Sequence, residues 1–255
     1  MTLKSPDGQR QSAPIEADGF VTLPPGKARE ICVHLQSAIL EHRIRPGAKL
    51  SEDEVGEIFG VSRTVVRGAL QALAHSQLVT IEPHRGAFVA NPSQKEALEV
   101  FGARALIEPG VAAMAAAKAT KLDIKRLLAH NDAEHDALAK ENMGMALALS
   151  GRFHIAISDI SGQTVLGGFI RSLISRSSLI IALYWRRRET ACESHCHAEL
   201  IDALAKRKPG TAEQIMKRHI LELQAGLELK ERTHQEKSLA DMLLPVSGSK
   251  RRRSG

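Results

Sequence analysis

The pattern of hydrophobic and polar positions predicts helices along most of this 255-residue chain. From Gln94 to Gln235 the pattern is helical only. Ala and Leu are abundant there, and aromatic residues make up 3% of the whole chain, which favours helix packing over sheets. The last helix is expected to begin at the capping box "TAEQ", Thr211 to Gln214. We therefore expect an all-α domain over 94–235, an antiparallel helical bundle, with helices at 94–118, 121–140, 142–160, 163–187, 190–207 and 211–233.

The N-terminal part, residues 24–93, has a different order of elements. A helix in "KAREICVHLQSAILEHRI" (27–44) has an apolar stripe at helical spacing and is broken at Pro46-Gly47. A short acidic helix follows in "SEDEVGEIFG". Ser51 can cap its start, its acidic first turn suits the positive end of the helix dipole, and Gly60 supplies a left-handed end.

The next segment, "GVSRTVVRGALQAL", predicts a helix that begins after Ser62. We expect the Ser62 hydroxyl to accept a hydrogen bond from the free N–H groups of the first turn. One face of the helix is apolar, through Val66, Leu70 and Leu73. The opposite face is polar, with Arg63, Thr64, Arg67 and Gln71. An ordinary amphipathic surface helix would show the same two faces.

Two β runs, 78–81 and 87–90, follow around the turn "EPHRG". The whole order (helix, acidic helix, turn, basic helix, hairpin) predicts a winged helix-turn-helix, in which the second helix of the pair lies in the major groove. Arginine there can reach guanine O6 and N7 or phosphates, and a glycine in the wing permits close approach. We therefore expect DNA contacts from Ser62, Arg63, Thr64, Arg67, His84, Arg85 and Gly86.

The charge distribution limits what a DNA-binding surface can look like. The net charge is +6 and the pI about 9.4, which is compatible with a polyanionic partner. However, residues 24–93 contain eight Lys or Arg and seven Asp or Glu, and part of the excess lies in "KRRR" at 250–253. The DNA footprint must therefore be a local patch and not a basic domain.

Three cysteines, Cys32, Cys192 and Cys196, suit a reducing cytosol better than a disulfide framework. Cys192 and Cys196 are four residues apart and can form a redox or metal pair or simply pack as small residues. The N-terminal stretch has no apolar segment of a signal peptide, and the run "LIIALYW" is too short to span a bilayer. We expect a cytoplasmic protein without membrane partners, a disordered arm at 1–23 and a basic disordered tail at 236–255.

Histidine spacing indicates a candidate metal site. His197 and His219 lie on the last two predicted helices, equidistant from Lys208 in the turn "KRKPGT". In an antiparallel helix pair both lie about 16 Å from the turn, at the same height. His154 is the natural third member, and three imidazoles with an open position can bind a divalent metal such as Zn²⁺ or Ni²⁺. The alternative is that these are surface histidines, since the chain has eleven.

The segment "LSEDEVGEIFGVSRTVVRGALQALAHSQLVTIEPHRGAFV" resembles the DNA-binding domain of GntR-type bacterial transcription regulators. The resemblance includes the run "GVSRT" and the wing "PHRG". Three positions depart from the family pattern: Val65 replaces the usual Pro, Gly68 the usual Glu and Gln77 the usual Gly. None is a presumed DNA contact, but Gly68 costs the helix on the order of 1 kcal/mol relative to Ala.

The fragments "RALIEP", "FH", "HAELIDAL" and "KRH" resemble the FCD effector domain of the FadR branch of this family. That resemblance implies a metal held by His154, His197 and His219 and by an Asp or Asn at the position that here is Ser150. A hydroxyl is a poor Zn²⁺ ligand, so metal binding is expected to be weaker, with water or the effector in that place, or lost. It also implies a small carboxylate effector. Arg104 is the first candidate to hold it, or else an ion-pair partner of Glu108, and Arg171 and Arg176 are further candidates.

These features together indicate a cytoplasmic, dimeric, ligand-responsive regulator, with repression as the expected sign, that binds a palindromic double-stranded operator. One alternative is a metal-free regulator whose effector is held by hydrogen bonds and arginines. A metal-dependent enzyme is another, but the chain lacks paired carboxylates, an H-E-x-x-H motif, a Gly-rich phosphate loop and a nucleophile elbow. A nucleoid-type binder led by the basic tail is the third.

Overall fold

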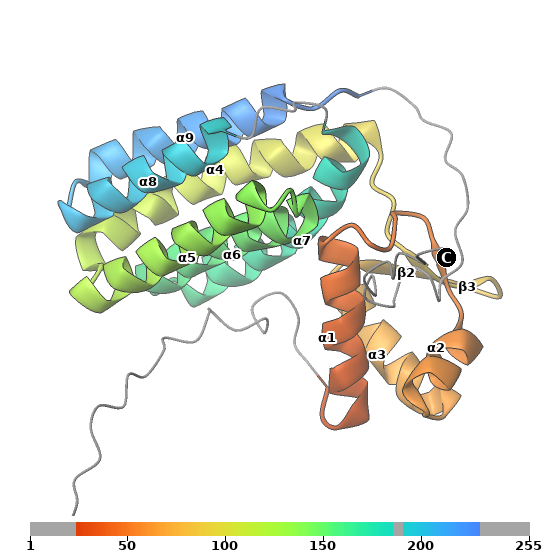
Figure 1. The fold of residues 1–255 in the computed structure, drawn as a ribbon. Helices are drawn as coiled ribbons and strands as arrows, with labels where there is room; N and C mark the ends of the chain where they lie inside the picture. Colours follow the sequence, from red (N-terminus) through yellow and green to blue (C-terminus); the bar gives the residue numbers. More distant parts are fainter. Residues whose placement is uncertain (1–23, 186–190, 230–255) are drawn as a thin grey trace, which may run out of the picture.

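The computed structural model describes residues 24–185 and 191–229. A small N-terminal unit of three helices and a sheet lies beside a larger bundle of helices (Figure 1). The expected arm at 1–23 and tail at 236–255 lie outside the described residues. The fold is mainly α, with an N-terminal winged helix-turn-helix and a C-terminal helical domain, as the sequence predicts.

Helix α1 (Lys27–Leu40) stands between the bundle and the other two helices of the N-terminal unit (Figure 1). Its buried face includes Ile31, Leu35 and Ile39, and it packs against α3 and also touches α6 and α7. The prediction that it extends to residue 44 is wrong. His42 adopts a left-handed conformation with φ 57° and ends the helix, although Ile44 remains buried.

The helix-turn-helix consists of α2 (Glu52–Phe59) and α3 (Arg63–His75). As predicted, the Ser51 side chain accepts from the Glu54 N–H and Gly60, with φ 62°, ends α2. Ser62 occupies the N-cap position of α3 as predicted, but its hydroxyl makes no capping hydrogen bond. Ser62 is exposed, so water can satisfy the first-turn N–H groups in its place.

The wing is part of a three-stranded antiparallel sheet in the order β1-β3-β2. Strands β2 (Val79–Glu82) and β3 (Gly86–Val89) are each displaced by about one residue from the predicted runs, because Glu82 pairs with Gly86 across the turn. The two-residue strand β1 (Lys49–Leu50) pairs with β3 and was not predicted. A strand this short has no alternating pattern to detect.

The bundle contains six helices in the described residues: α4 (Gln94–Lys118), α5 (Lys121–Ala139), α6 (Met143–Ser161), α7 (Thr164–Tyr184), α8 (Ala191–Ala205) and α9 (Pro209–Ala225). Their starts agree with the predicted starts to within two residues. The capping box predicted at Thr211 is wrong, because α9 already begins at Pro209, whose fixed φ suits the first helical position. A capping box instead starts α5, between Thr120 and Asp123.

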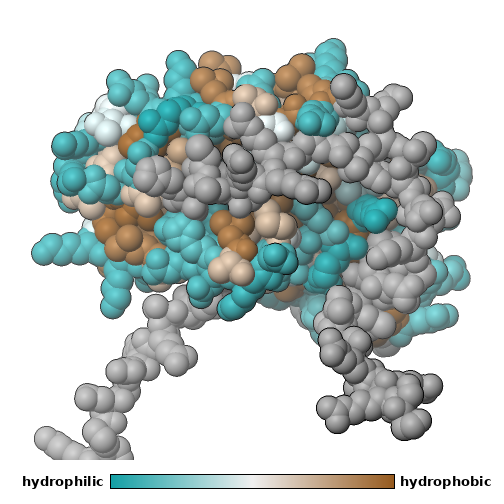
Figure 2. All heavy atoms as spheres, turned by 45° about the horizontal axis from the view of Figure 1, so that its top comes forward, coloured by the Kyte–Doolittle hydropathy of each residue, from teal (hydrophilic) through white to brown (hydrophobic). Residues whose placement is uncertain are grey.

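Among the described residues, α4 and α7 are long and apolar enough to cross a membrane by length and composition alone. Both instead pack within the bundle and contribute to its core, α4 through Phe101 and α7 through Ile180. Seen from the side of α8 and α9, the surface shows separate hydrophobic groups among hydrophilic residues (Figure 2). This is the ordinary distribution for core helices and scattered surface apolar residues.

The two parts of the chain share one continuous hydrophobic cluster. The core of the N-terminal unit is joined by Val111, Ala148, Ile155, Ile170, Ile174 and Leu179 from the bundle. At the same boundary, Gly144 of α6 lies directly against the backbone of Glu41, where a Cβ would come within 2.0 Å of the Glu41 oxygen. The His42 Nε2 lies 3.3 Å from the Ser178 carbonyl oxygen and bonds the two parts.

Gly68 allows a direct test of how α3 is stabilised. A Cβ at Gly68 would meet no atom within 4 Å, so Gly68→Ala should raise the free energy of unfolding by about 0.5–1 kcal/mol through helix propensity alone. Denaturant unfolding followed by circular dichroism measures it. Gly56→Ala is the matched control: its Cβ would lie 3.0 Å from the Val61 oxygen, so this variant should be less stable. Equal effects of the two variants would contradict the open geometry at Gly68.

Candidate metal centre and nucleic-acid interface

Three buried histidines from three helices converge in the centre of the bundle. His154 comes from α6, His197 from α8 and His219 from α9. One ligand atom from each lies within 4.8 Å of the other two. The convergence expected from the helix spacing is therefore correct in geometry. All three are at most 3% exposed, so the surface-residue alternative does not hold for them.

Two buried carboxylates orient these rings. Glu108 of α4 lies 2.6 Å from His154 Nδ1, and Glu134 of α5 lies 2.9 Å from His197 Nδ1. A carboxylate accepts hydrogen bonds only, so in each pair the Nδ1–H donates and the Nε2 is left for another partner. Carboxylate–histidine pairs of this kind are the usual support of metal-binding histidines. The ring of Phe153 stacks on His197 at a centroid distance of 4.1 Å and fixes its plane.

Burial and charge keep this cluster in the protonation states that metal binding needs. Burial lowers the pKa of His154, and burial with the neighbouring His197 and His154 lowers the pKa of His219 well below its usual range. Burial also acts to raise the pKa of Glu108, but Arg104 and His154 outweigh it and hold the pKa at about 2. The imidazoles of His154 and His219 are therefore neutral and the Glu108 carboxyl is ionised at neutral pH.

The donor set fits a divalent cation. His154 Nε2 and His219 Nε2 are 3.2 Å apart, close to the roughly 3.3 Å expected between two nitrogens that each lie about 2.05 Å from one tetrahedral ion. His197 Nε2 is buried without a hydrogen-bond partner, an arrangement that costs free energy unless the nitrogen binds something. Ser150 lies one turn before His154 on α6, is buried and lines the cavity beside His154.

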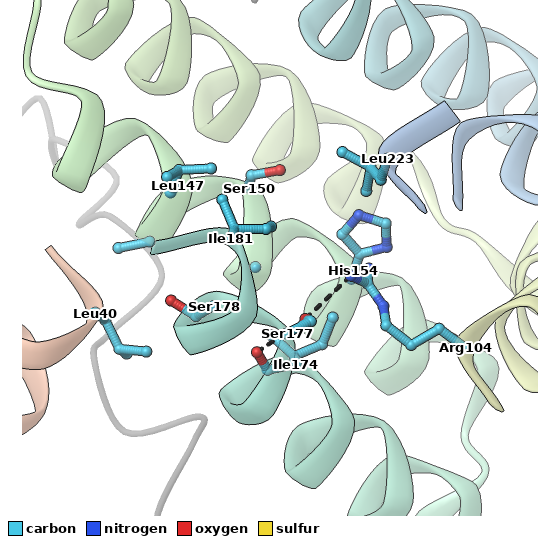
Figure 3. A pocket seen from close by; sticks show the side chains of 12 residues that line it. Leu40, Arg104, Leu147, Ser150, His154, Ile174, Ser177, Ser178, Ile181 and Leu223 are labelled. Atoms are coloured by element: carbon cyan, nitrogen blue, oxygen red, sulfur yellow. Dashed lines mark hydrogen bonds between the residues drawn. The ribbon is translucent and has the colours of Figure 1, made fainter. Parts of the chain in front are cut away.

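A small cavity of about 20 Å³, room for one or two water molecules, lies beside His154. Figure 3 looks into it and shows Arg104 beside His154, with Ser150 and Ser178 on other parts of the wall. The wall is formed by Leu40, Arg104, Leu147, Ala148, Ser150, Gly151, His154, Ile174, Ser177, Ser178, Ile181 and Leu223. Leu40 belongs to α1, so the N-terminal unit closes one side of the cavity.

Arg104 forms the ion pair considered for it from the sequence and also lines the cavity. Its Nε donates to Glu108 at 2.5 Å and its Nη1 donates to Ser177 Oγ at 3.1 Å, which braces α4 against α7. The side chain nevertheless lines the cavity, and its Nη2 is buried without a partner. The Ser178 hydroxyl is unpartnered as well. These buried donors suit a ligand with acceptor oxygens.

The structure does not bring Arg171 and Arg176 to the cavity. Arg171 pairs with Asp159 at 2.5 Å, and Arg176 pairs with Glu96 at 3.0 Å. Both arginines are about one-third exposed, and neither lines the cavity wall. Their positions on α7 turn them toward acidic residues of neighbouring helices, so the expectation that they line this cavity is wrong.

The cysteine pair is not supported as a reactive site. Cys32 is a buried free thiol in the N-terminal unit, and the Cys192 side chain lies outside the described residues. Burial raises the pKa of Cys196 to about 11. A thiol that stays protonated at neutral pH is a poor nucleophile and metal ligand.

The predicted DNA-reading residues of α3 lie on one exposed face. Ser62, Arg63, Thr64 and Arg67 are exposed, opposite the buried Val66, Leu70 and Leu73. Each arginine is held by an acidic residue of α2. Arg67 donates to both oxygens of Glu52, at 3.0 and 2.8 Å, and Arg63 pairs with Asp53. The hydrogen bond from Arg67 lowers the pKa of Glu52, which therefore stays ionised.

The wing tip has the conformation that the sequence suggested. His84 and Gly86 have positive φ angles, 62° and 103°, which make the tight turn between β2 and β3. His84, Arg85 and Gly86 are all exposed. Arg85 pairs with Glu82 and lies over the Phe88 ring at 5.4 Å. The turn thus presents one arginine at its tip.

Sequence reasoning missed Glu134 as part of the candidate metal centre. The signal was present, because Leu127, Glu134 and Ala137 share the buried stripe of α5. A glutamate in a core position at helical spacing indicates a buried partner. Glu108 was expected only as an ion-pair partner of Arg104, although it also contacts His154.

Comparison with protein families agrees with this division. Residues 27–89 match the model of the bacterial regulatory proteins of the gntR family, and residues 99–222 match the FCD domain. Neither description names an enzyme. The first match covers the winged helix-turn-helix, and the second covers the bundle with all three histidines.

Individual relatives agree as well. The chain is 26% identical over 181 residues to the Nta operon transcriptional regulator of Aminobacter aminovorans, covering 71% of this chain and 85% of that protein. It is 28% identical over 192 residues to the HTH-type transcriptional repressor RspR of Escherichia coli K12, covering 74% and 83%. A GntR transcriptional regulator structure from Rhodococcus sp. RHA1 has a TM-score of 0.69 at 26% identity, covering 78% and 96%. The chain therefore belongs to the GntR family of transcriptional regulators and has the DNA-binding and FCD effector domains of that family.

Proposed function

We propose that this regulator is a cytoplasmic homodimer that represses transcription from a palindromic operator and responds to a small organic acid. The observation that carries the proposal is the composition of the cavity wall. Arg104 and His154 of the effector domain and Leu40 of the DNA-binding domain line the same space. A ligand in this space contacts both domains, which is what a ligand-responsive regulator requires.

DNA reading is assigned to the exposed face of α3 and to the wing. Arg63 and Arg67 reach base edges or phosphates in the major groove, with Ser62 and Thr64 beside them. His84, Arg85 and Gly86 approach the adjacent groove from the wing. Exposure and a shared face support this assignment.

Arg67→Ala tests the assignment of α3. The operator is first defined by selection from a pool of randomised duplexes with the wild-type protein. Loss of a base contact should then weaken operator binding about ten- to hundredfold, measured by fluorescence anisotropy. Arg45→Ala, an exposed arginine before β1, is the control and should change binding little. Unchanged operator binding by Arg67→Ala would overturn the assignment.

A divalent metal is assigned to His154, His197 and His219. When bound, the metal would supply Lewis acidity toward an effector oxygen. The chain's own residues set the conditions: Glu108 and Glu134 hold two rings in place, and Ser150 leaves the usual carboxylate position open to the effector or to water. Arg104 Nη2 donates to an acceptor oxygen of the effector.

Metal content tests this centre. Untagged protein purified without chelator should contain about one transition metal per chain by mass spectrometry, and His197→Ala should lose it. His135→Ala, an exposed histidine on α5, should keep it, and circular dichroism confirms folding of each variant. Ser150→Asp adds a carboxylate ligand, so it should retain metal against a chelator better than the wild type. Wild-type protein that takes up no zinc or nickel on incubation would overturn the metal assignment.

A metal-free mode is the second candidate, favoured by Ser150. In that mode Arg104 and Ser178, which both line the cavity and each have an unpartnered buried atom, hold the effector by hydrogen bonds alone. The same metal measurement separates the two modes, because only the metal-free mode predicts an effector response from protein that binds no metal.

The size of the cavity indicates how the domains communicate. About 20 Å³ is too small for an organic acid, so effector entry must move part of the wall. The boundary with α1 is held by the contact of Leu40 and by the bond from His42 to Ser178. Movement there reorients the DNA-binding domain, and by linkage bound operator weakens the effector by the same factor.

A hydrophobic ridge on α4 supports the homodimer. Leu98 and Leu106 alternate with Gly102 and Gly110 at intervals of four residues, and Leu106 is 85% exposed. A Cβ at either glycine would meet no atom within 4 Å, so each glycine leaves a notch. A row of large and small residues fits a second copy of itself across a two-fold axis, with leucines over glycines.

Leu106→Arg should therefore convert the dimer to a monomer, because it places a charge in the centre of the apolar contact. Light scattering coupled to size-exclusion chromatography measures the mass. Leu122→Arg is the control, since Leu122 on α5 is also exposed, at 55%, but lies outside the ridge. A Leu106→Arg protein that remains dimeric would place the interface elsewhere.

A further inference from the structure

We infer that Glu52 and Asp53 of α2 are specificity-determining residues, because they hold the two DNA-reading arginines and withhold them from phosphate. The inference rests on the proposed DNA-reading role of Arg63 and Arg67. Beyond that role, the acidic residues set the ratio between the affinity for the operator and the affinity for DNA of random sequence.

Arg67 and Glu52 form a bidentate ion pair. Arg67 Nε and Nη2 donate to separate oxygens of Glu52 at 3.0 and 2.8 Å, from residues fifteen positions apart. The arginine side chain is still 61% exposed and that of Glu52 31% exposed. The guanidinium is therefore held at the surface with N–H groups left for a base edge, and it is not free to follow a phosphate.

The same arrangement recurs at the other candidate arginines. Arg63 pairs with Asp53, and in the wing Arg85 pairs with Glu82. Three arginines and three carboxylates thus meet on the proposed DNA face, and their charges cancel. Non-specific DNA affinity comes from cations that neutralise phosphates. Because the carboxylates compete for these three arginines, we expect them to contribute little non-specific affinity.

An arginine–carboxylate pair also matches base edges better than it matches the backbone. Arginine donates to O6 and N7 of guanine, and a carboxylate accepts from the N4 amino group of cytosine. A phosphate offers acceptors only. To bind the arginine it must displace the carboxylate, and the two negative charges then repel each other. The pair therefore lowers binding to the backbone more than binding to a G·C-containing site.

The acidic first turn of α2 also stabilises the helix dipole, and the experiment must separate that effect from the pairing with arginine. Glu52, Asp53 and Glu54 all lie at the N-terminus of α2 and stabilise its dipole. Glu54 is exposed, and no arginine of the described residues pairs with its carboxylate, while its backbone N–H donates to Ser51 Oγ. Glu54→Gln removes the same charge from the same turn, so it is the matched control for Glu52→Gln.

The experiment measures binding of each full-length variant to a random-sequence duplex and to the selected operator over a series of salt concentrations. Glu52→Gln should bind the random duplex about threefold more tightly than Glu54→Gln does, the middle of the range for one exposed ion pair. Its plot of log affinity against log salt should steepen by about 0.9, the value for one added phosphate contact. Its preference for the operator over the random duplex should fall.

A double-variant cycle completes the test. In the Arg67→Ala background, Glu52→Gln should have no more effect than Glu54→Gln, because the arginine that it frees is gone. Equal behaviour of Glu52→Gln and Glu54→Gln in the wild-type background would overturn the inference. If instead Arg67→Ala itself leaves operator binding unchanged, the DNA-reading role of α3 fails, which is a different outcome.

Discussion

Two carboxylates buried inside an apolar bundle are the constraint on which the centre of this protein depends. Glu108 and Glu134 are at most 2% exposed, and a buried charge is tolerated only with partners close by. Arg104 and His154 supply partners for Glu108, and His197 supplies one for Glu134. These contacts join α4 to α6 and α5 to α8, so the same bonds that satisfy the carboxylates also align the rings.

The balance of charge at this centre is consistent with an anionic effector. Glu108 is ionised and pairs with Arg104, and His154 and His219 are neutral at neutral pH. A divalent cation at the three histidines would add positive charge close to Arg104. Together the cation and the guanidinium would attract a carboxylate.

The sequence predicted the parts of the fold and site that depend on regular spacing. The convergence of His197 and His219 follows from helix geometry around one turn, and the exposed polar face of α3 follows from its two-sided pattern. Features that depend on contacts between distant elements were missed or wrong. The pairing of Arg171 with Asp159 has no periodic signature, and the spacing that marks Glu134 as buried does not identify His197 as its partner. Helix α1 ends early because His42 adopts a left-handed conformation. Histidine at this position does not by itself predict that conformation.

The hydrophobic cluster that crosses from the winged helix into the bundle has a consequence for how the chain folds. Ile155, Ile170 and Ile174 of the effector domain pack in the same core as Leu35 and Leu70 of the DNA-binding domain. Residues 90–98 separate the two family matches, but they do not separate two independent hydrophobic cores. Severing the chain there would leave each fragment with apolar surface that the other normally covers, and that surface favours aggregation over independent folding. We therefore expect that a destabilising substitution among the shared core residues of either domain will also destabilise the other domain.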